Sequence, residues 1–392
     1  MRAHRNIPMK PSFCAIANRQ TGEDLIGTAG HYQAYVLIEC PRPWAAKVFN
    51  SKTIPTALRD YVKALKAERS IQFLAVDRGK KNAASDSVTV MVYERQLPSD
   101  GASLNVDSPD KRTTGFESVR NYRGYEFQLD SLAQVVDCLE AHWRGDRIGQ
   151  PIKYQDILIC THGMRDKCCA RFGQPLFREA AHSAEQVKVP ITRIWKVSHI
   201  GGHRFAPTAI SLPDGRYYGR LTIEALESIV NRSGSVDQLN AVYRGWGMLP
   251  APLQILERQL MMHRGWSWFD CTVNYRILSD RAFKDVAQAN ISSTSEKPAT
   301  REPPTPAHLR ELSVGVSVMI AGVAHAVYQA KVVQDPKETI CTKVSCDNAV
   351  AVPISKYTVV ECIQVKSKDS AAPAVPSKAI VAQASSTTVF FN

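Results

Sequence analysis

Two short segments, one rich in cysteine and one in histidine, restrict the possible folds of this chain more than any other feature. CTHGMRDKCC, at residues 160–169, continues an apolar run typical of a buried strand and leads into a helical pattern. HIGGH, at residues 199–203, follows a second predicted strand, and its two glycines favour a loop wrapped closely around something. Thiolates and imidazoles together suit a metal, so we expect the fold to bring both segments to one site.

Other uses of the cysteine-rich segment explain less. A cysteine phosphatase needs an arginine six residues after its nucleophile, whereas Arg165 comes five after Cys160, and a thioredoxin-type redox pair needs C-x-x-C. Zinc stays chemically possible, although zinc modules usually space their cysteines as C-x₂₋₄-C and Cys160 and Cys169 are nine apart. On a helix, Cys168 and Cys169 would point about 100° apart, so one should be a ligand and the other should pack. Spacing alone does not distinguish them.

The remaining pattern predicts an α/β protein with thioredoxin-like layered domains, that is, two α/β units plus a small β-rich C-terminal segment. The first unit has the order strand, helix, strand, strand, helix, and the second has the order β-α-β-β-β-α, which is compatible with a thioredoxin-like layer. A stretch rich in Ser, Thr and Pro predicts a linker, and a final stretch rich in Ala, Ser and Pro predicts a disordered tail. The expected boundaries are 12–148, 150–275, 290–308 (linker), 309–366 (β-rich) and 367–392 (tail).

Composition and charge limit the function classes. Hydrophobic residues make up 44% and charged residues 22%, as in soluble globular proteins, and the net charge of +12 favours an acidic partner. We expect no nucleic-acid role, because no long Lys/Arg run or recognised binding motif is present. The uncharged stretch 312–330 nearly reaches membrane-spanning length, but its valines alternate with small residues, which predicts strands. The N-terminus has no apolar signal region, so we predict a cytoplasmic protein whose ten cysteines stay reduced.

Four stretches of sequence carry a resemblance to a known family. CTHGMRDKCCARFG followed by HIGGHRFAPTAISLPDGRYYG resembles the sucrase/ferredoxin-like family, whose cluster-bearing half is a thioredoxin-like ferredoxin. The likeness extends to FCAIANRQTGEDLIGTAGHYQAYVLIECPRPW and to YRGWGMLPAPLQILE, and covers about residues 12–265. The resemblance implies a [2Fe–2S] cluster, with Cys168 as a non-ligand neighbour and with four ligands: Cys160, Cys169, His199 and His203.

This ligand set implies redox chemistry. Two thiolates neutralise a dicationic [2Fe–2S] core, whereas four would leave it negative, so the potential should be higher, as in Rieske centres. A ligating histidine whose second nitrogen reaches solvent could also gain a proton on reduction, which would couple proton and electron transfer. We therefore predict an electron carrier with a redox partner protein, acidic in charge. The alternative is a zinc-binding Cys₂His₂ structural or interaction module without redox activity.

Catalytic functions have less support. Glycoside hydrolysis needs two opposed carboxylates, and no stretch indicates such a pair, so hydrolase (sucrase) activity is not predicted. No G-x-G-x-x-G follows a clear strand, so neither a nicotinamide nor a flavin is expected.

The other cysteines and one histidine have plainer interpretations. His162 is expected to shape its turn, with metal binding as the alternative. Cys341 and Cys346, in CTKVSC, are interpreted as unrelated β-region cysteines rather than as a metal-binding or disulfide pair. Five more are interpreted as small buried residues: Cys14, Cys40, Cys138, Cys271 and Cys362.

Overall fold

The computed structural model describes residues 13–68, 70–78, 87–95, 117–187, 192–280, 310–320, 323–348 and 350–365. They divide into two compact units. The first contains described residues from 1–101, 119–269 and 340–354, and the second those from 102–118, 270–339 and 355–392. The expected linker at 290–308 and the tail at 367–392 lie outside the described residues.

The N-terminal half of the first unit is a βαβ element followed by an antiparallel ββα element. Strands β1 and β2 are parallel, β3 is antiparallel to β1, and β5 is antiparallel to β3. Apolar residues of α2 and α3, such as Leu58 and Leu139, pack with Val36 and Phe73 on one face of this sheet. The elements are β1 (Ala34–Glu39), α2 (Thr56–Glu68), β2 (Ile71–Asp77), β3 (Val88–Arg95), β5 (Tyr122–Leu129) and α3 (Val135–Arg144).

The second half of this unit follows the same path. Strands β7 and β8 are parallel, β9 is antiparallel to β7, and β10 is antiparallel to β9. Both halves therefore have the thioredoxin-like strand order, β2-β1-β3-β5 in one and β8-β7-β9-β10 in the other. The elements are β7 (Gln155–Cys160), α4 (Lys167–Val187), β8 (Thr192–Val197), β9 (Ala209–Leu212), β10 (Arg216–Tyr218) and α5 (Ile223–Asn231).

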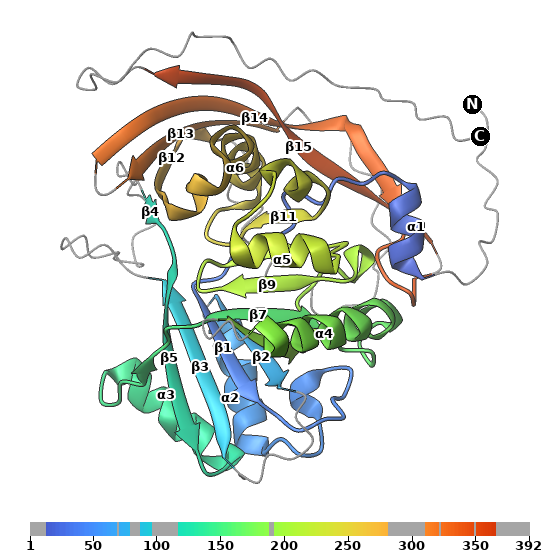
Figure 1. The fold of residues 1–392 in the computed structure, drawn as a ribbon, viewed down its shortest axis with the longest axis vertical. Coiled ribbons are helices and arrows are strands. Elements are labelled where there is room, and N and C mark those ends of the chain that lie inside the picture. Colours follow the sequence, from blue (N-terminus) through green and yellow to red (C-terminus); the bar gives the residue numbers. More distant parts are fainter. Residues whose placement is uncertain are drawn as a thin grey trace. The chain divides into compact units, whose positions relative to one another are not determined.

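One antiparallel strand pair joins the two halves. Val76 of β2 pairs with Val197 of β8, which gives a ten-stranded sheet of order β11-β10-β9-β7-β8-β2-β1-β3-β5-β6. The strands of the two halves run in clearly different directions in Figure 1, as the twist of a large sheet requires. The α/β prediction is confirmed. The expected division into domains 12–148 and 150–275 stays a prediction, and one continuous sheet runs through both of these ranges. The remaining elements of this unit are α1 (Cys14–Gln20), η1 (Val48–Asn50), η2 (Leu132–Gln134), β6 (Gln150–Pro151), η3 (His203–Phe205), η4 (Val236–Ala241), β11 (Tyr243–Trp246) and α6 (Ala251–Arg264).

The second unit is built around a five-stranded sheet of order β15-β14-β13-β12-β4. Val314, Val316 and Val318 alternate along β13 and are all buried, so the uncharged stretch forms strands. Among the described residues, no helix is both long and apolar enough to cross a membrane. The strands are β4 (Glu117–Val119), β12 (Thr272–Asp280), β13 (Arg310–Ile320), β14 (Val323–Thr342) and β15 (Val352–Val365), and η5 (Gly265–Asp270) precedes β12.

A buried carboxylate connects the two halves of the ten-stranded sheet. Asp156, on β7, accepts hydrogen bonds from Arg193 Nε (2.7 Å) and Nη2 (2.8 Å) and from Trp195 Nε1 (2.6 Å). The hydroxyl of Tyr93, on β3, donates to the same carboxylate, and Arg193 also pairs with Glu126 on β5. A buried charge is tolerated only when it is paired in this way.

The α4 helix crosses the end of β7 at a glycine. A Cβ atom on Gly173 would lie 2.0 Å from the carbonyl oxygen of Cys160 and 3.1 Å from its carbonyl carbon. Only a residue without a side chain lets the helix backbone approach the strand this closely. The position of Cys160 relative to the start of α4 therefore depends on Gly173.

We predict that Asp156→Ala lowers the free energy of unfolding by about 3–5 kcal/mol, because it leaves a partly buried arginine and two buried hydrogen-bond donors, Trp195 Nε1 and the Tyr93 hydroxyl, without their acceptor. The measurement is chemical denaturation followed by circular dichroism. Asp60→Ala, at an exposed position of α2, is the control and should change stability by less than about 0.5 kcal/mol. Equal losses in the two variants would contradict the assigned role of Asp156.

We predict that Gly173→Ala destabilises the protein by about 1–3 kcal/mol, because the added methyl group collides with the Cys160 carbonyl. Helix propensity alone predicts the opposite sign, a gain of about 1 kcal/mol. Thermal and chemical denaturation measure the change, and Arg171→Ala, at an exposed position of the same helix, is the control. A stabilised Gly173→Ala variant would show that the close approach does not exist.

Candidate metal centre

The two predicted cysteine ligands lie side by side at the junction of β7 and α4. Cys160 is the last residue of β7 and Cys169 the third residue of α4, and each is about 1% exposed. A hydrogen bond from Cys169 holds the pKa of the Cys160 thiol well below its ordinary value, with further help from His199 and against the effect of burial. The Cys169 pKa is raised by the same pairing. One buried thiolate, ready to bind a metal, is therefore favoured here.

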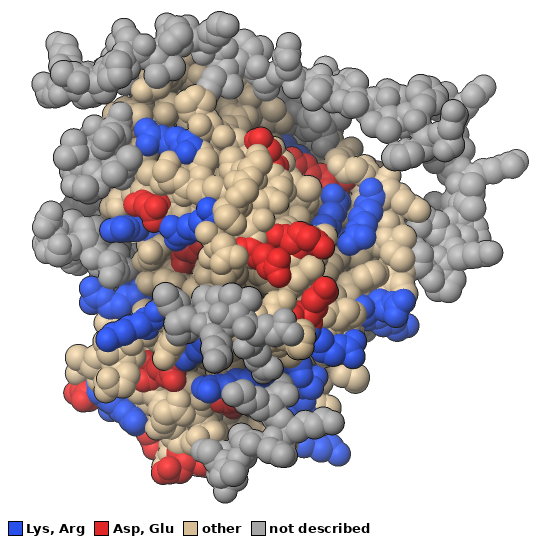
Figure 2. Space-filling model, in the orientation of Figure 1, with Lys and Arg blue, Asp and Glu red and all other residues tan. Residues whose placement is uncertain are grey.

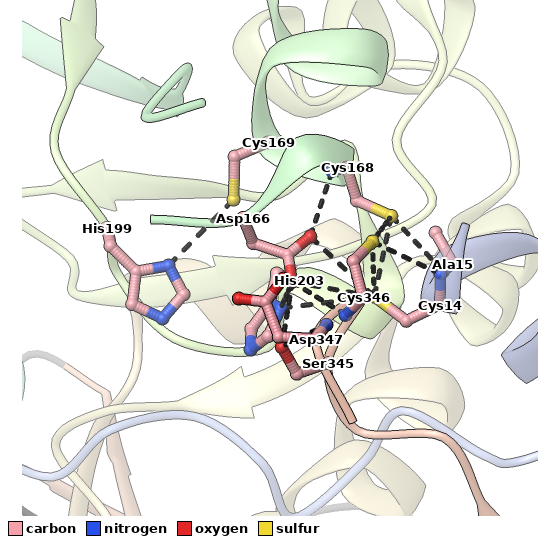
Figure 3. A network of polar contacts seen from close by, with 10 residues as sticks. All are labelled: Cys14, Ala15, Asp166, Cys168, Cys169, His199, His203, Ser345, Cys346 and Asp347. Atoms are coloured by element: carbon pink, nitrogen blue, oxygen red, sulfur yellow. Dashed lines mark hydrogen bonds and ion pairs between the residues drawn. The ribbon is translucent and has the colours of Figure 1, made fainter. Parts of the chain in front are cut away.

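His199 joins these cysteines from the neighbouring strand. β7 and β8 are parallel, and Cys160 pairs with Val197, so the residues that follow both strands emerge at one edge of the sheet. His199 Nδ1 lies 3.8 Å from Cys169 Sγ (Figure 3). The ligand atoms of Cys160, Cys169 and His199 all lie within 4.8 Å of one another. The structure thus brings three of the four predicted ligands together.

His203 lies next to this group but is held by a carboxylate. Gly201 and Gly202 have positive φ angles of 80° and 72°, and this left-handed turn brings the chain back so that the His203 ring is 5.0 Å from that of His199. His203 Nδ1 is 2.6 Å from Asp166 Oδ2. Its nitrogens are not within the group of three ligand atoms. A metal-binding histidine commonly donates its other ring N–H to a carboxylate, so this contact leaves Nε2 to face a metal.

His162 supports the loop, and neither of its ring nitrogens is left to bind a metal, because both form hydrogen bonds. Its Nε2 donates to the carbonyl oxygen of Ala45 (2.9 Å), and its Nδ1 accepts from the backbone N–H of His199 (3.3 Å). Burial lowers its pKa, which keeps the ring neutral and able to accept. The Trp44 ring packs edge-on against it, with centroids 5.8 Å apart. The expectation that His162 shapes this turn agrees with these contacts.

Asp166 is the residue at this site that our sequence analysis did not single out as functional. Its Oδ1 accepts from the backbone N–H of Cys168 (2.9 Å), and its Oδ2 accepts from the backbone N–H of Cys346 (2.9 Å), from Ser345 Oγ (3.1 Å) and from His203. Burial works against ionisation, but His203 and the two N–H groups hold the Asp166 pKa below its ordinary value. The only hint in the sequence is its place between the two predicted ligands.

Three further cysteines form a second group beside Asp166. The sulfur of Cys168 does not join the first group but lies 3.4 Å from the sulfurs of Cys14 and Cys346 (Figure 3). This placement agrees with Cys168 not being a ligand of the first group. Cys14 is buried, as expected, but neither that expectation nor the interpretation of Cys346 as an unrelated β-region cysteine predicted this contact, because the two cysteines are 332 residues apart.

The fold and site can be compared with known proteins. Two similar proteins are both named "Altered inheritance of mitochondria protein 32", from Meyerozyma guilliermondii (31% identical, over 21% of this chain and 30% of the relative) and from Clavispora lusitaniae (32% identical, over 25% and 37%). The matches thus span about a third of the length of these relatives.

A solved structure and a family model complete the comparison. A thioredoxin-like [2Fe–2S] ferredoxin from Aquifex aeolicus is 17% identical and matches 25% of this chain and 96% of its own, with a TM-score of 0.21. The model of the Sucrase/ferredoxin-like family matches residues 25–245, more than half of the 392 residues. The chain therefore belongs to the Sucrase/ferredoxin-like family.

Proposed function

We propose that this chain is an electron-transfer protein that carries one [2Fe–2S] cluster, with two cysteine and two histidine ligands: Cys160, Cys169, His199 and His203. The observation that supports this most is the convergence of two buried thiols and an imidazole at the end of β7 and β8. The cluster would supply one-electron chemistry, because its irons alternate between two oxidation states.

The donor set fits this group chemically. Two thiols and an imidazole lie within 4.8 Å of one another, and a second imidazole ring lies 5.0 Å from the first, so these residues would provide the two-thiolate, two-imidazole donor set of a Rieske-type cluster. Thiolate and imidazole are donors that iron accepts. The hydrogen bond from His203 Nδ1 to Asp166 fixes the tautomer and the ring orientation that binding through Nε2 requires.

Burial is uneven across the site and suggests where a partner approaches. The two cysteines are almost fully buried, which excludes water from the sulfur side, whereas the His203 side chain is 18% exposed. We infer that electrons enter and leave on the histidine side. The net charge of +12 favours an acidic redox protein as partner. Figure 2 shows Lys and Arg interspersed with Asp and Glu on one face, so charge alone does not mark the docking site there.

We predict that protein purified without oxygen contains about two irons and two sulfides per chain, and that its visible absorption bleaches on reduction. Cys160→Ala and Cys169→Ala should each remove the iron, while Cys341→Ser, which alters an exposed cysteine, should retain it. Elemental analysis, absorption and electron paramagnetic resonance of the reduced protein measure this. A colourless protein with zinc in place of iron would instead support a structural Cys₂His₂ module.

We predict that replacing both histidine ligands, His199→Cys with His203→Cys, keeps the iron but lowers the reduction potential by on the order of 100 mV or more, because two thiolates add negative charge. A spectroscopic redox titration gives the potential. His263→Cys, an exposed position on α6, is the control for adding a thiol elsewhere. An unchanged potential in the double variant would exclude the two histidines as ligands.

A further inference from the structure

Three cysteines distant in sequence place their sulfur atoms against one another beside Asp166. Cys14 opens α1, Cys168 is the second residue of α4, and Cys346 lies between β14 and β15. Their sulfurs are separated by 3.4 Å (Cys14 to Cys168), 3.4 Å (Cys168 to Cys346) and 3.7 Å (Cys346 to Cys14). Figure 3 shows the three side chains pointing toward one another. All three are free thiols.

The size of this triangle suits a tetrahedral metal ion. A centre about 2.3 Å from each of the three sulfurs, the usual Zn–S distance, exists about 1 Å outside their plane. A metal ion can therefore occupy this centre without the three sulfur atoms moving further apart. Their distances are also far above a disulfide bond length of about 2.05 Å.

A fourth donor is available on Asp166. Its Oδ1 lies 3.8 Å from Cys14 Sγ, and one of its oxygens lies within 4.8 Å of all three sulfurs. A carboxylate has about four acceptor positions. Oδ2 accepts from the Cys346 N–H, from Ser345 Oγ and from His203, whereas Oδ1 accepts one N–H bond, from Cys168, and faces the Cys14 thiol. When Cys14 loses its proton on binding a metal, the lone pair of Oδ1 that faces it becomes available to the same metal.

The backbone also favours thiolates in this group. The N–H of Ala15 points to Cys168 Sγ at 3.4 Å, and the N–H of Cys14 points to Cys346 Sγ at 3.5 Å. Three thiolates and a carboxylate packed this closely would repel one another, and a divalent cation at their centre would offset much of that repulsion. Binding would release the thiol protons.

We propose that Cys14, Cys168 and Cys346, with Asp166 as fourth ligand, bind one Zn²⁺ ion at a structural site that shares no ligand with the [2Fe–2S] site. Four protein ligands close the coordination sphere, which is the pattern of a structural zinc site. The ion would tie the start of α1 and the segment between β14 and β15 to the helix that carries Cys169. The Zn²⁺ site would thus stabilise the frame around the iron ligands without taking part in electron transfer.

The test is metal analysis of the full chain, made without a polyhistidine tag and purified without oxygen from zinc-supplemented cells. We expect about one zinc per chain in addition to iron. The Cys346→Ser variant should contain at least fivefold less zinc per chain than the wild-type protein and should keep its iron. Cys341→Ser, five residues earlier and exposed, should keep both metals. Cys14→Ser should match Cys346→Ser, and circular dichroism checks that each variant is folded.

Each other outcome overturns the proposal. Wild-type protein without zinc, or a folded Cys346→Ser variant that keeps it, excludes the site. Loss of iron rather than zinc in Cys346→Ser assigns this cysteine to the iron site instead. A disulfide among the three cysteines in the purified chain, detected by mass spectrometry after alkylation, also excludes it. Because iron and zinc are counted in the same sample, failure of the zinc site and failure of the cluster are distinguishable.

Discussion

The buried carboxylate of Asp166 is the contact on which the arrangement of both cysteine groups depends. It accepts the backbone N–H groups of Cys168 and Cys346, so it fixes the start of α4 and the segment after β14 at one point. It also accepts from His203 and thereby orients the ring that we assign to the cluster. A buried carboxylate needs several donors to stay ionised, and those donors are supplied by the residues that must be positioned. The Asp166 side chain therefore positions both the second group of cysteines and the His203 ring of the proposed cluster site.

The two halves of the ten-stranded sheet share a path but differ in chemistry. Glu39 ends β1 and pairs with Val76 of β2, just as Cys160 ends β7 and pairs with Val197 of β8. Yet residues 40–50, which follow β1, contain one cysteine and no histidine, and residues 78–87, which follow β2, contain no histidine. The repeated fold therefore does not bring a repeated set of metal-binding side chains, because the four proposed ligands all lie in one half, at the end of β7, at the start of α4 and after β8. The N-terminal half instead contributes Ala45, which holds His162 in place.

Local patterns predicted much of this structure, and long-range contacts account for what they missed. The β-type apolar patterns of Ile71–Arg78 and Val88–Arg95 predict strands, and the helical apolar spacing that begins at Thr56 predicts a helix. These segments match β2, β3 and α2 to within about one residue, because apolar spacing and caps are local signals. A proline inside a helical pattern, here Pro175, predicts an interruption of the helix. Helix α4 nevertheless runs through Pro175, because packing against β7 and β8 outweighs one lost hydrogen bond. The continuity of the sheet depends on Val76 meeting Val197, and the second cysteine group depends on Cys14 meeting Cys346. No spacing rule connects residues so far apart.

The central claim is that two thiols and two imidazoles from separate strand ends hold one iron-containing group. Anomalous X-ray diffraction from crystals of the full chain, recorded on either side of the iron absorption edge, tests it most directly. The account predicts iron density bonded to all four side chains: Cys160, Cys169, His199 and His203. Iron bonded to a set without both histidines, or no iron density at the ends of β7 and β8, would contradict it.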